Sequence, residues 1–92
     1  MGYIFEWDSR KAQSNLNKHG ISFDEATTIF ADPLSLLMDD PKHSADEQRF
    51  LVIGHSVQHR LLVVAFAERP PRTRIISARL ATRHERNQYE QE

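Results

Sequence analysis

The sequence has no cysteine among its 92 residues. It therefore contains neither a disulfide framework nor a thiolate metal site, and this composition fits a reducing cytoplasm, where we expect the protein. No apolar run approaches the roughly 18–20 residues that a membrane-spanning helix needs. The first residues carry acidic side chains rather than a basic and then apolar pattern, so they do not predict a signal peptide.

The sequence also lacks a strong net charge, which is −1. The charges are unevenly distributed, since residues 1–47 carry four Lys or Arg and nine Asp or Glu, whereas residues 48–92 carry eight Arg and four acidic residues. Six of these arginines lie between residues 69 and 86, where the one acid is Glu85. Arginine suits phosphate because its planar guanidinium donates two hydrogen bonds side by side. The cluster predicts either a polyanion site or a solvated surface balanced by the acidic half.

The length suits one domain, 1–92, and the sequence shows neither an internal repeat nor a linker. A chain this short buries only about 60–65% of the surface that its unfolded form exposes. We therefore expect a thin core, to which a partner protein can add buried surface.

Two helices are predicted in the first third of the chain. Asp8 or Ser9 can cap the first, which runs to about His19 and stops at Gly20. Ser22 and Glu25 have the capping-box spacing and open the second, which ends before Asp32-Pro33. A last helix is predicted over residues 80–90, with a poor apolar face.

Apolar and aromatic runs predict five strands, over residues 3–7, 34–38, 50–53, 61–66 and 74–77. Residues 39–47 are predicted to form a polar loop, residues 54–60 a hairpin connection, and Pro70-Pro71 a turn. The order of elements predicts an α+β fold: a mostly antiparallel four- to five-stranded sheet with two N-terminal helices and one C-terminal helix.

Several motifs then carry a resemblance to a known family. They are Phe5-Glu6-Trp7-Asp8, Lys18-His19-Gly20-Ile21-Ser22-Phe23-Asp24-Glu25-Ala26, Asp46-Glu47-Arg49, Ile53-Gly54, Arg74-Ile75-Ile76-Ser77-Ala78-Arg79 and Glu85-Arg86-Tyr89. In this order they resemble the BrnT family over nearly the whole chain. One position departs from the family, which commonly has Gly-Arg at the end of the central hairpin where this chain has His59-Arg60. A glycine there permits a positive φ, which histidine tolerates less well.

The resemblance implies a RelE-like fold and an endoribonuclease toxin of a type II toxin–antitoxin system. Such a toxin cleaves RNA without a metal ion or cofactor, inhibits translation and growth, and is neutralised by a BrnA-like antitoxin. The antitoxin carries a DNA-binding ribbon-helix-helix element. The toxin would therefore be linked to DNA only through the antitoxin, in a complex that represses its own operon. A complex of two copies of each protein is one option.

Metal-free RNA cleavage uses the ribose 2′-hydroxyl as nucleophile on the adjacent phosphate. It needs a base, an acid at the leaving 5′-oxygen and cations at the phosphorane oxygens, for which His and Arg are suited. An aromatic side chain can stack on a base. The candidate catalytic residues are Arg79, Arg74, Arg49, Lys18 and His19. The candidate RNA-binding residues are Arg83, Arg86, Arg60, Tyr89 and His55.

Several candidates also have a structural interpretation. His55 lies in or beside a loop and can be an ordinary surface histidine. Lys18 and His19 lie where a helix dipole favours cations. Arg79, Arg83 and Arg86 have the spacing of one helical stripe, whose like charges suit an anionic partner. Arg49 or Arg79 can instead pair with an acid such as Glu47, and Tyr89 can be a packing residue.

Two other functions compete with the ribonuclease. A metal-dependent nuclease would use the carboxylates and histidine of one loop, namely Asp39, Asp40, His43, Asp46 and Glu47. A non-catalytic module would use the C-terminal Arg patch only to bind nucleic acid or protein. Cleavage that survives a chelator separates the ribonuclease from both.

Overall fold

The computed structural model describes residues 2–40 and 48–91. Within these residues the elements follow the predicted β-α-α-β-β-β-β-α order. They are β1 (Phe5–Glu6), α1 (Ser9–His19), α2 (Phe23–Thr28), the short 3-10 helix η1 (Ile29–Ala31), β2 (Leu36–Asp39), β3 (Arg49–His55), β4 (Leu61–Arg69), β5 (Arg72–Leu80) and α3 (Arg83–Glu90).

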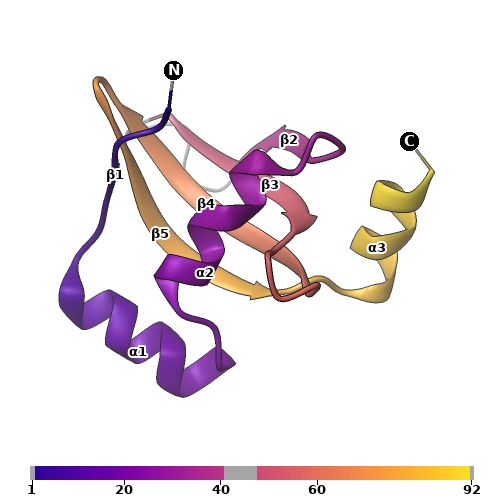
Figure 1. Ribbon diagram of the computed structural model, residues 1–92, viewed down its shortest axis with the longest axis horizontal. Helices are drawn as coiled ribbons and strands as arrows, with labels where there is room; N and C mark the ends of the chain where they lie inside the picture. The colour runs from indigo at the N-terminus through magenta and orange to yellow at the C-terminus, as the bar shows by residue number, and fades with distance from the viewer. Residues whose placement is uncertain (1, 41–47, 92) are drawn as a thin grey trace.

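The strands form one five-stranded sheet in the order β1-β5-β4-β3-β2. Among the described residues only β1 and β5 pair in parallel, so the predicted α+β fold with a mostly antiparallel sheet is confirmed. Helices α1 and α2 cover one face of the sheet, and α3 lies beside the end of the sheet at which β5 ends (Figure 1). The likeness to RelE-type toxins stays a prediction.

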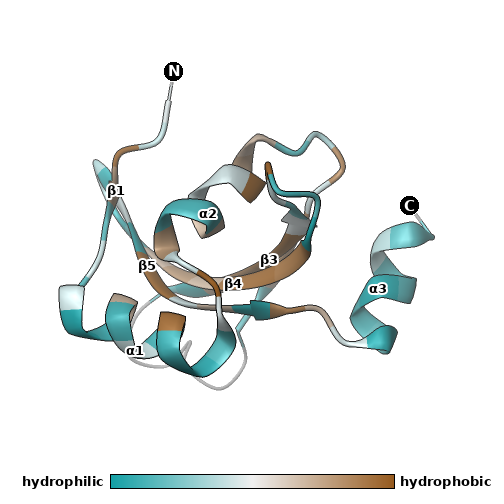
Figure 2. Cartoon of the chain, turned by 60° about the horizontal axis from the view of Figure 1, so that its bottom comes forward, coloured by the Kyte–Doolittle hydropathy of each residue, from teal (hydrophilic) through white to brown (hydrophobic). Residues whose placement is uncertain are grey.

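The main core lies between the sheet and its first two helices. The buried side chains of this cluster are Ile21, Phe23, Ala26, Ile29, Val52, Leu62, Val64, Phe66, Ile75 and Ala78. A smaller cluster covers part of the opposite face, where Tyr89 of α3 packs on Ile53, Leu61 and Val63. The apolar strands and the largely hydrophilic α1 and α3 are visible in Figure 2. Most of the hydrophobic burial therefore belongs to the α1–α2 side.

Helix α1 begins and ends where the sequence predicts. The Asp8 side chain accepts hydrogen bonds from the backbone N–H groups of Arg10 and Lys11. Gly20 ends the helix with a φ of 72°, a left-handed conformation that glycine adopts without steric cost.

The start of α2 differs in one detail from the capping box that its sequence predicts. Ser22 Oγ accepts the hydrogen bond of the Glu25 N–H, as in such a box. The Glu25 carboxylate does not return to Ser22, because it binds Arg60 and Ser56 instead. Only the hydrogen bond to Ser22 of the capping box is formed, and the Glu25 side chain makes tertiary contacts instead.

Three predicted boundaries are wrong. Residues 3–7 yield only the two-residue strand β1, and the strand predicted at 34–38 lies at Leu36–Asp39. The last helix begins at Arg83 rather than at residue 80, because β5 continues to Leu80, which pairs with Leu62. Arg79 therefore lies on a strand, and the predicted helical stripe of three arginines does not exist.

The hairpin between β3 and β4 contains the residue that departs from the family pattern. His59 has a φ of 65°, and no other non-glycine residue within 2–40 and 48–91 has a positive φ. The turn keeps the left-handed conformation that glycine adopts easily, so His59 carries the strain of that conformation.

Candidate functional site

Three of the predicted catalytic arginines share one face of the sheet. Ala67 of β4 pairs with Arg49 on one side and Arg74 on the other, and Val63 pairs with Arg79. Directly paired residues point to the same face, and alternate residues of β4 do so as well. Because Val63 belongs to the smaller cluster, this is the face opposite α1 and α2. We refer to it as the arginine face.

Two of these arginines are held by acids of the same chain. The Arg74 Nη1 atom lies 3.3 Å from Glu6 Oε2. Arg79 makes a two-pronged contact with Glu85, at 2.7 Å from Nη1 and 2.8 Å from Nη2. Glu85 is therefore the acidic partner of Arg79, whereas the partner suggested from the sequence, Glu47, lies outside the described residues.

The contact between Arg79 and Glu85 also anchors α3. Glu85 completes a capping box with Thr82, whose backbone N–H it accepts at 2.9 Å. The hydrogen bond from Arg79 is the main cause that lowers the pKa of Glu85 to about 2. Burial of the carboxylate acts against this shift, and the hydrogen bonds with Thr82 add to it. The same bond raises the pKa of Arg79. Arg79 thus keeps its charge, its side chain is 39% exposed, and its position is fixed by the last helix.

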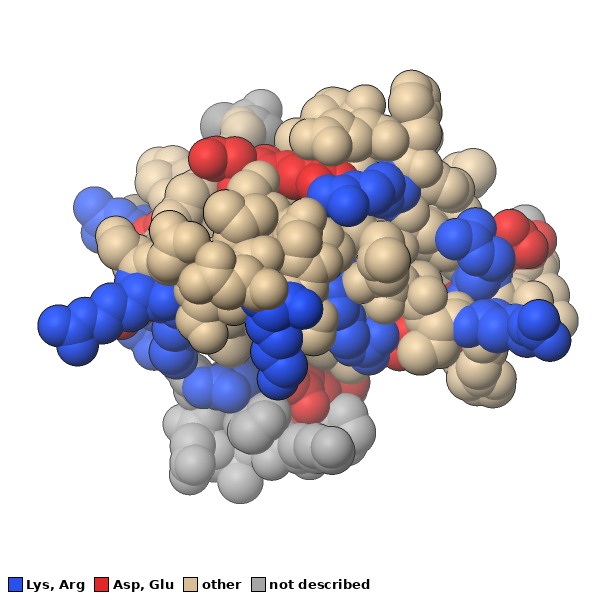
Figure 3. Space-filling model, turned by 90° about the horizontal axis from the view of Figure 1, so that it is seen from below, with Lys and Arg blue, Asp and Glu red and all other residues tan. Residues whose placement is uncertain are grey.

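The end of α1 brings two further candidates to the edge of β5. Lys18 and His19 line an open groove of about 210 Å³ together with Ile76 and Ser77. Ser77 pairs with Ala65, an alternate neighbour of Ala67 on β4, so the groove opens beside the arginine face. Figure 3 shows basic side chains in a band across the underside of the molecule, with acidic side chains among them. Basic side chains gathered in this way suit a polyanion.

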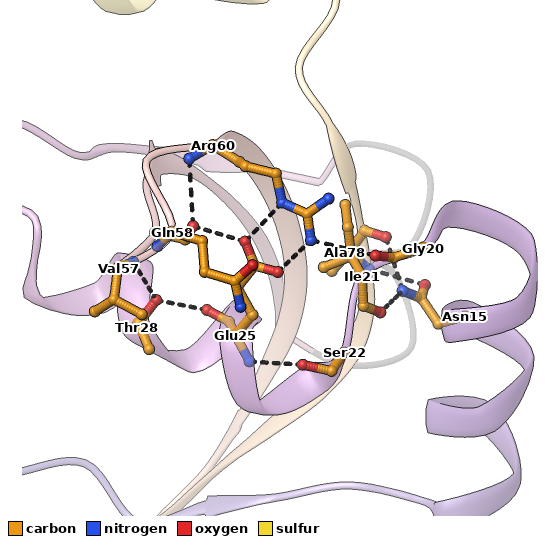
Figure 4. Close-up of polar contacts among 11 residues, drawn as sticks. Asn15, Gly20, Ile21, Ser22, Glu25, Thr28, Val57, Gln58, Arg60 and Ala78 are labelled. Atoms are coloured by element: carbon orange, nitrogen blue, oxygen red, sulfur yellow. Dashed lines mark hydrogen bonds and ion pairs between the residues drawn. The ribbon is translucent and has the colours of Figure 1, made fainter.

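Arg60 has a structural partner that the sequence did not predict. Its Nε atom donates to Glu25 Oε2 at 2.9 Å, and Nη2 binds Glu25 Oε1 and, at 3.2 Å, the carbonyl of Gly20 (Figure 4). The Glu25 side chain is only 2% exposed. The bond to Arg60, against the effect of burial, lowers the pKa of Glu25. Arg60 therefore neutralises a buried acid, and its contact with RNA stays a prediction.

Tyr89, predicted to contact RNA, is largely buried in this structure. It is 7% exposed and packs on the smaller cluster. Its hydroxyl donates to Asp32 Oδ2 at 2.6 Å and lies 3.1 Å from Nδ1 of His55. Burial, followed by the hydrogen bond to Asp32, raises the pKa of Tyr89 to about 12. Tyr89 therefore packs on the sheet and contacts His55, while a contact of Tyr89 with RNA stays a prediction.

The remaining candidates lie on α3 and on β3. Arg83 and Arg86 are exposed on α3, and Arg86 lies 3.8 Å from Glu90. Arg49 is the first residue of β3, one residue before the predicted strand.

The metal-site alternative falls largely on residues that the structure does not describe. His43, Asp46 and Glu47 lie outside the described residues, while Asp39 ends β2 and Asp40 follows it. Among residues 2–40 and 48–91, no three His, Asp or Glu side chains lie close enough to hold a metal ion. Among the same residues, every helix is too short or too polar to cross a membrane.

Sequence reasoning missed two groups that shape the site. Asp32 was assigned only to the end of a helix, although Asp before Pro is also a common anchor for backbone N–H groups. Thr82 and Glu85 have the capping-box spacing, a local signal that predicts the start of α3.

Comparisons with known proteins point to one family. The family described as a ribonuclease toxin, BrnT, of type II toxin-antitoxin systems matches residues 7–85. Among solved structures, the chain is similar to the 1.1 Å crystal structure of the Brucella abortus ribonuclease toxin BrnT, with a TM-score of 0.69 and 24% identity. The match covers 89% of this chain and 100% of that chain, and at this identity it shows a shared fold. No curated protein matches the sequence.

Proposed function

The chain belongs to the BrnT family of ribonuclease toxins of type II toxin–antitoxin systems, and from this premise we propose that it cleaves RNA on the arginine face without a metal ion. One observation carries the proposal. Arg49, Arg74 and Arg79 come from two strands and share the face that α1 and α2 leave open. Cations fixed on rigid strands can stabilise the charge that develops on a phosphorane.

The chemistry requires only groups that this chain supplies. The 2′-hydroxyl attacks the adjacent phosphorus, the bond to the 5′-oxygen breaks, and a 2′,3′-cyclic phosphate results. Arginine stays protonated at any working pH and can contact two phosphate oxygens together. Lys18 and His19, at the edge of the same face, add positive charge or a proton-transfer group.

We further propose that a BrnA-like ribbon-helix-helix antitoxin neutralises the chain in the cytoplasm. The thin core supports a partner that adds buried surface, because most of the burial lies on one side of the sheet. The antitoxin would supply the DNA contacts with which the pair represses its own operon.

Cleavage of a labelled RNA in excess chelator tests the proposed chemistry. We expect unchanged cleavage rates with and without chelator and a product that ends in a 2′,3′-cyclic phosphate. Loss of cleavage in chelator would replace the proposal with a metal-dependent nuclease. Tight RNA binding without any cleavage would replace it with a non-catalytic binding module.

Growth of a bacterium that expresses the chain tests the biological role. We expect growth to stop and RNA integrity to fall on induction, and both effects to be reversed by co-expression of the antitoxin. Unimpeded growth in the presence of soluble, full-length protein would contradict the toxin assignment.

A further inference from the structure

Three side chains form a hydrogen-bonded chain between the end of β3 and the last helix. Tyr89 Oη lies 2.6 Å from Asp32 Oδ2 and 3.1 Å from Nδ1 of His55, and the two rings meet edge to face. Asp32 is itself fixed, because its carboxylate accepts the backbone N–H groups of His55 at 2.8 Å and Leu34 at 2.9 Å. The position of the imidazole is therefore set by a rigid acid and a buried phenol.

The hydrogen bonds also determine where the protons lie. Burial opposes the charge on Asp32, but its hydrogen bonds with His55 N–H, Tyr89 O–H and Leu34 N–H together lower the pKa of this carboxyl. An ionised carboxylate can only accept, so the single phenolic proton of Tyr89 points to Asp32. Tyr89 Oη must then accept from His55, which places the proton of the neutral imidazole on Nδ1.

This arrangement leaves Nε2 of His55 with its lone pair. Within residues 2–40 and 48–91, Nε2 has no hydrogen-bond partner, and the side chain is 43% exposed. The titratable groups that face the imidazole are Tyr89 from α3 and Asp32 from the segment between η1 and β2. Arg60, in the hairpin that follows His55, is turned toward Glu25 instead.

His55 also lies on the correct face of the sheet. His55 lies six positions after Arg49 along β3, and residues an even number of positions apart on a strand point to the same side of the sheet. On α3, Arg86 lies three residues before Tyr89 and therefore next to it on the helix surface. An RNA strand held by these arginines would pass the exposed imidazole.

We infer that His55 is the general base of RNA cleavage by this chain, and that Tyr89 and Asp32 are positioning residues that present its Nε2 to the substrate. The inference rests on the proposed function. Nε2 takes the proton of the 2′-hydroxyl while the bond from O2′ to phosphorus forms. The bond from phosphorus to O5′ breaks, its electron pair stays on O5′, and O5′ takes a proton from water. The resulting hydroxide is neutralised by the proton on the imidazolium.

Single-turnover cleavage of a short RNA in chelator, measured across pH, tests the assignment. The variants are His55→Ala, Tyr89→Phe, which keeps the ring, and His84→Ala, which removes an exposed histidine of α3 as a control. We expect His55→Ala to slow cleavage by about 10²–10⁴-fold while RNA affinity is retained. The decline of the rate on the acid side should vanish, and added imidazole should restore part of the rate. Tyr89→Phe should slow cleavage by a smaller factor, and His84→Ala should behave as the unmodified chain.

Rates are expressed per folded molecule from a melting curve of each preparation, and His55→Gln replaces His55→Ala if the latter does not fold. If the unmodified chain cleaves in chelator and His55→Ala cleaves equally fast, the inference fails while the proposed function stands. A slow variant whose pH profile is unchanged and which imidazole does not rescue assigns His55 a structural role, which also overturns the inference. An unmodified chain that cuts no RNA overturns both.

Discussion

Several arginines of this chain are held by carboxylates of the same chain. Arg60 forms an ion pair with Glu25, Arg74 with Glu6, and Arg79 with Glu85. A guanidinium carries five N–H donors, so an acid on one edge leaves donors for a substrate on another. Such a pairing also fixes the side chain before the substrate arrives, which lowers the entropic cost of binding. Ion pairing within the chain and contact with phosphate are therefore compatible roles.

Arg79 is the residue for which the two roles can be separated. Arg79→Ala and Glu85→Gln both break the same ion pair, and each should destabilise the fold by about 1–2 kcal/mol because the pair also supports a helix cap. Only Arg79→Ala removes the cation, so we expect it to slow RNA cleavage by about 10²–10³-fold per folded molecule. Glu85→Gln should slow cleavage far less, because it keeps the cation and loses only part of what fixes its position. Melting curves and cleavage rates on the same preparations make the comparison.

Arg79→Lys adds a second check, because an ammonium group cannot reproduce the two-pronged contact and should rescue little of the rate. Equal cleavage rates for Arg79→Ala and Glu85→Gln would contradict the catalytic assignment and leave Arg79 a purely structural role.

The pKa of Glu85 predicts a contribution to acid stability. This pKa is about 2 in the folded chain, below the value near 4.3 of an unperturbed glutamate. When the pKa of a carboxyl is lower in the folded chain than in the unfolded chain, its charged form stabilises the fold fully at a pH above the unfolded-state pKa. This stabilisation is lost as the pH falls toward the folded-state pKa. The difference in urea midpoint between the unmodified chain and Glu85→Gln should therefore be full at pH 6 and shrink between about pH 4.3 and 2. A difference that stays constant down to pH 2 would rule this linkage out.

The helices show what local sequence can and cannot predict. Helix α1 was predicted correctly because its cap, Asp8, and its stop, Gly20, are signals within the helix itself. The start of α3 also has a local signal, the capping box of Thr82 and Glu85, which the prediction of a helix from residue 80 overlooked. The end of β5 has no such signal, because it depends on pairing with Leu62, which is distant in the sequence. The shift in register near Ala65 and Phe66 is likewise a property of two strands together.

The turn after β3 gives a direct test of backbone strain. His59 has a φ of 65°, a conformation that costs an L-residue with a side chain about 1–2 kcal/mol. We expect His59→Gly to raise the free energy of unfolding by about 0.5–1 kcal/mol, since the flexibility of glycine offsets part of the gain. The matched control is Gln58→Gly, one residue earlier in the same turn at a negative φ, which should destabilise the chain. A lower melting temperature for His59→Gly would show that its imidazole makes a stabilising contact that outweighs the strain.

The whole surface, rather than any one contact, should determine how RNA affinity responds to salt. Each phosphate contact on a single strand contributes a slope of about −0.7 to the log–log plot of affinity against salt concentration. If Arg83 and Arg86 both contact phosphates, replacing both with Ala should flatten the slope by about 1.4. Titrations with a 2′-O-methyl RNA, which cannot be cut, give the slope.

The control removes the same charge from the hairpin between β4 and β5, by replacing Arg69, which ends β4, and Arg72, which begins β5, with Ala. The slope of this control should stay close to that of the unmodified chain. Equal flattening by the two double variants would mean that net charge alone matters, and it would remove Arg83 and Arg86 from the RNA contacts.

The sequence predicted the basic character of the site better than its internal geometry. Clustered arginines are visible in a linear sequence, but Arg74 and Arg79 are five residues apart, so alternation alone would place them on opposite faces of β5. The register shift between β4 and β5 near Ala65 and Phe66 puts both on one face, which the sequence does not predict. The contacts that fix the side chains join residues far apart in the sequence, such as Asp32 with Tyr89. Such pairings follow from the packing of α3 on the sheet, which no local pattern encodes.

The side chain of Asn15 has a consequence for how copies of this chain meet. Strand β1 pairs with β5 only at Thr73 and Arg74, so beyond them β5 presents an edge to α1. There the Asn15 amide donates to the carbonyl of Ala78 at 2.9 Å and accepts its N–H at 3.0 Å, as a neighbouring strand would (Figure 4). An uncovered edge is a template for pairing between molecules. Asn15→Ala should therefore favour aggregation through strand addition, which light scattering of the variant and of the unmodified chain would measure.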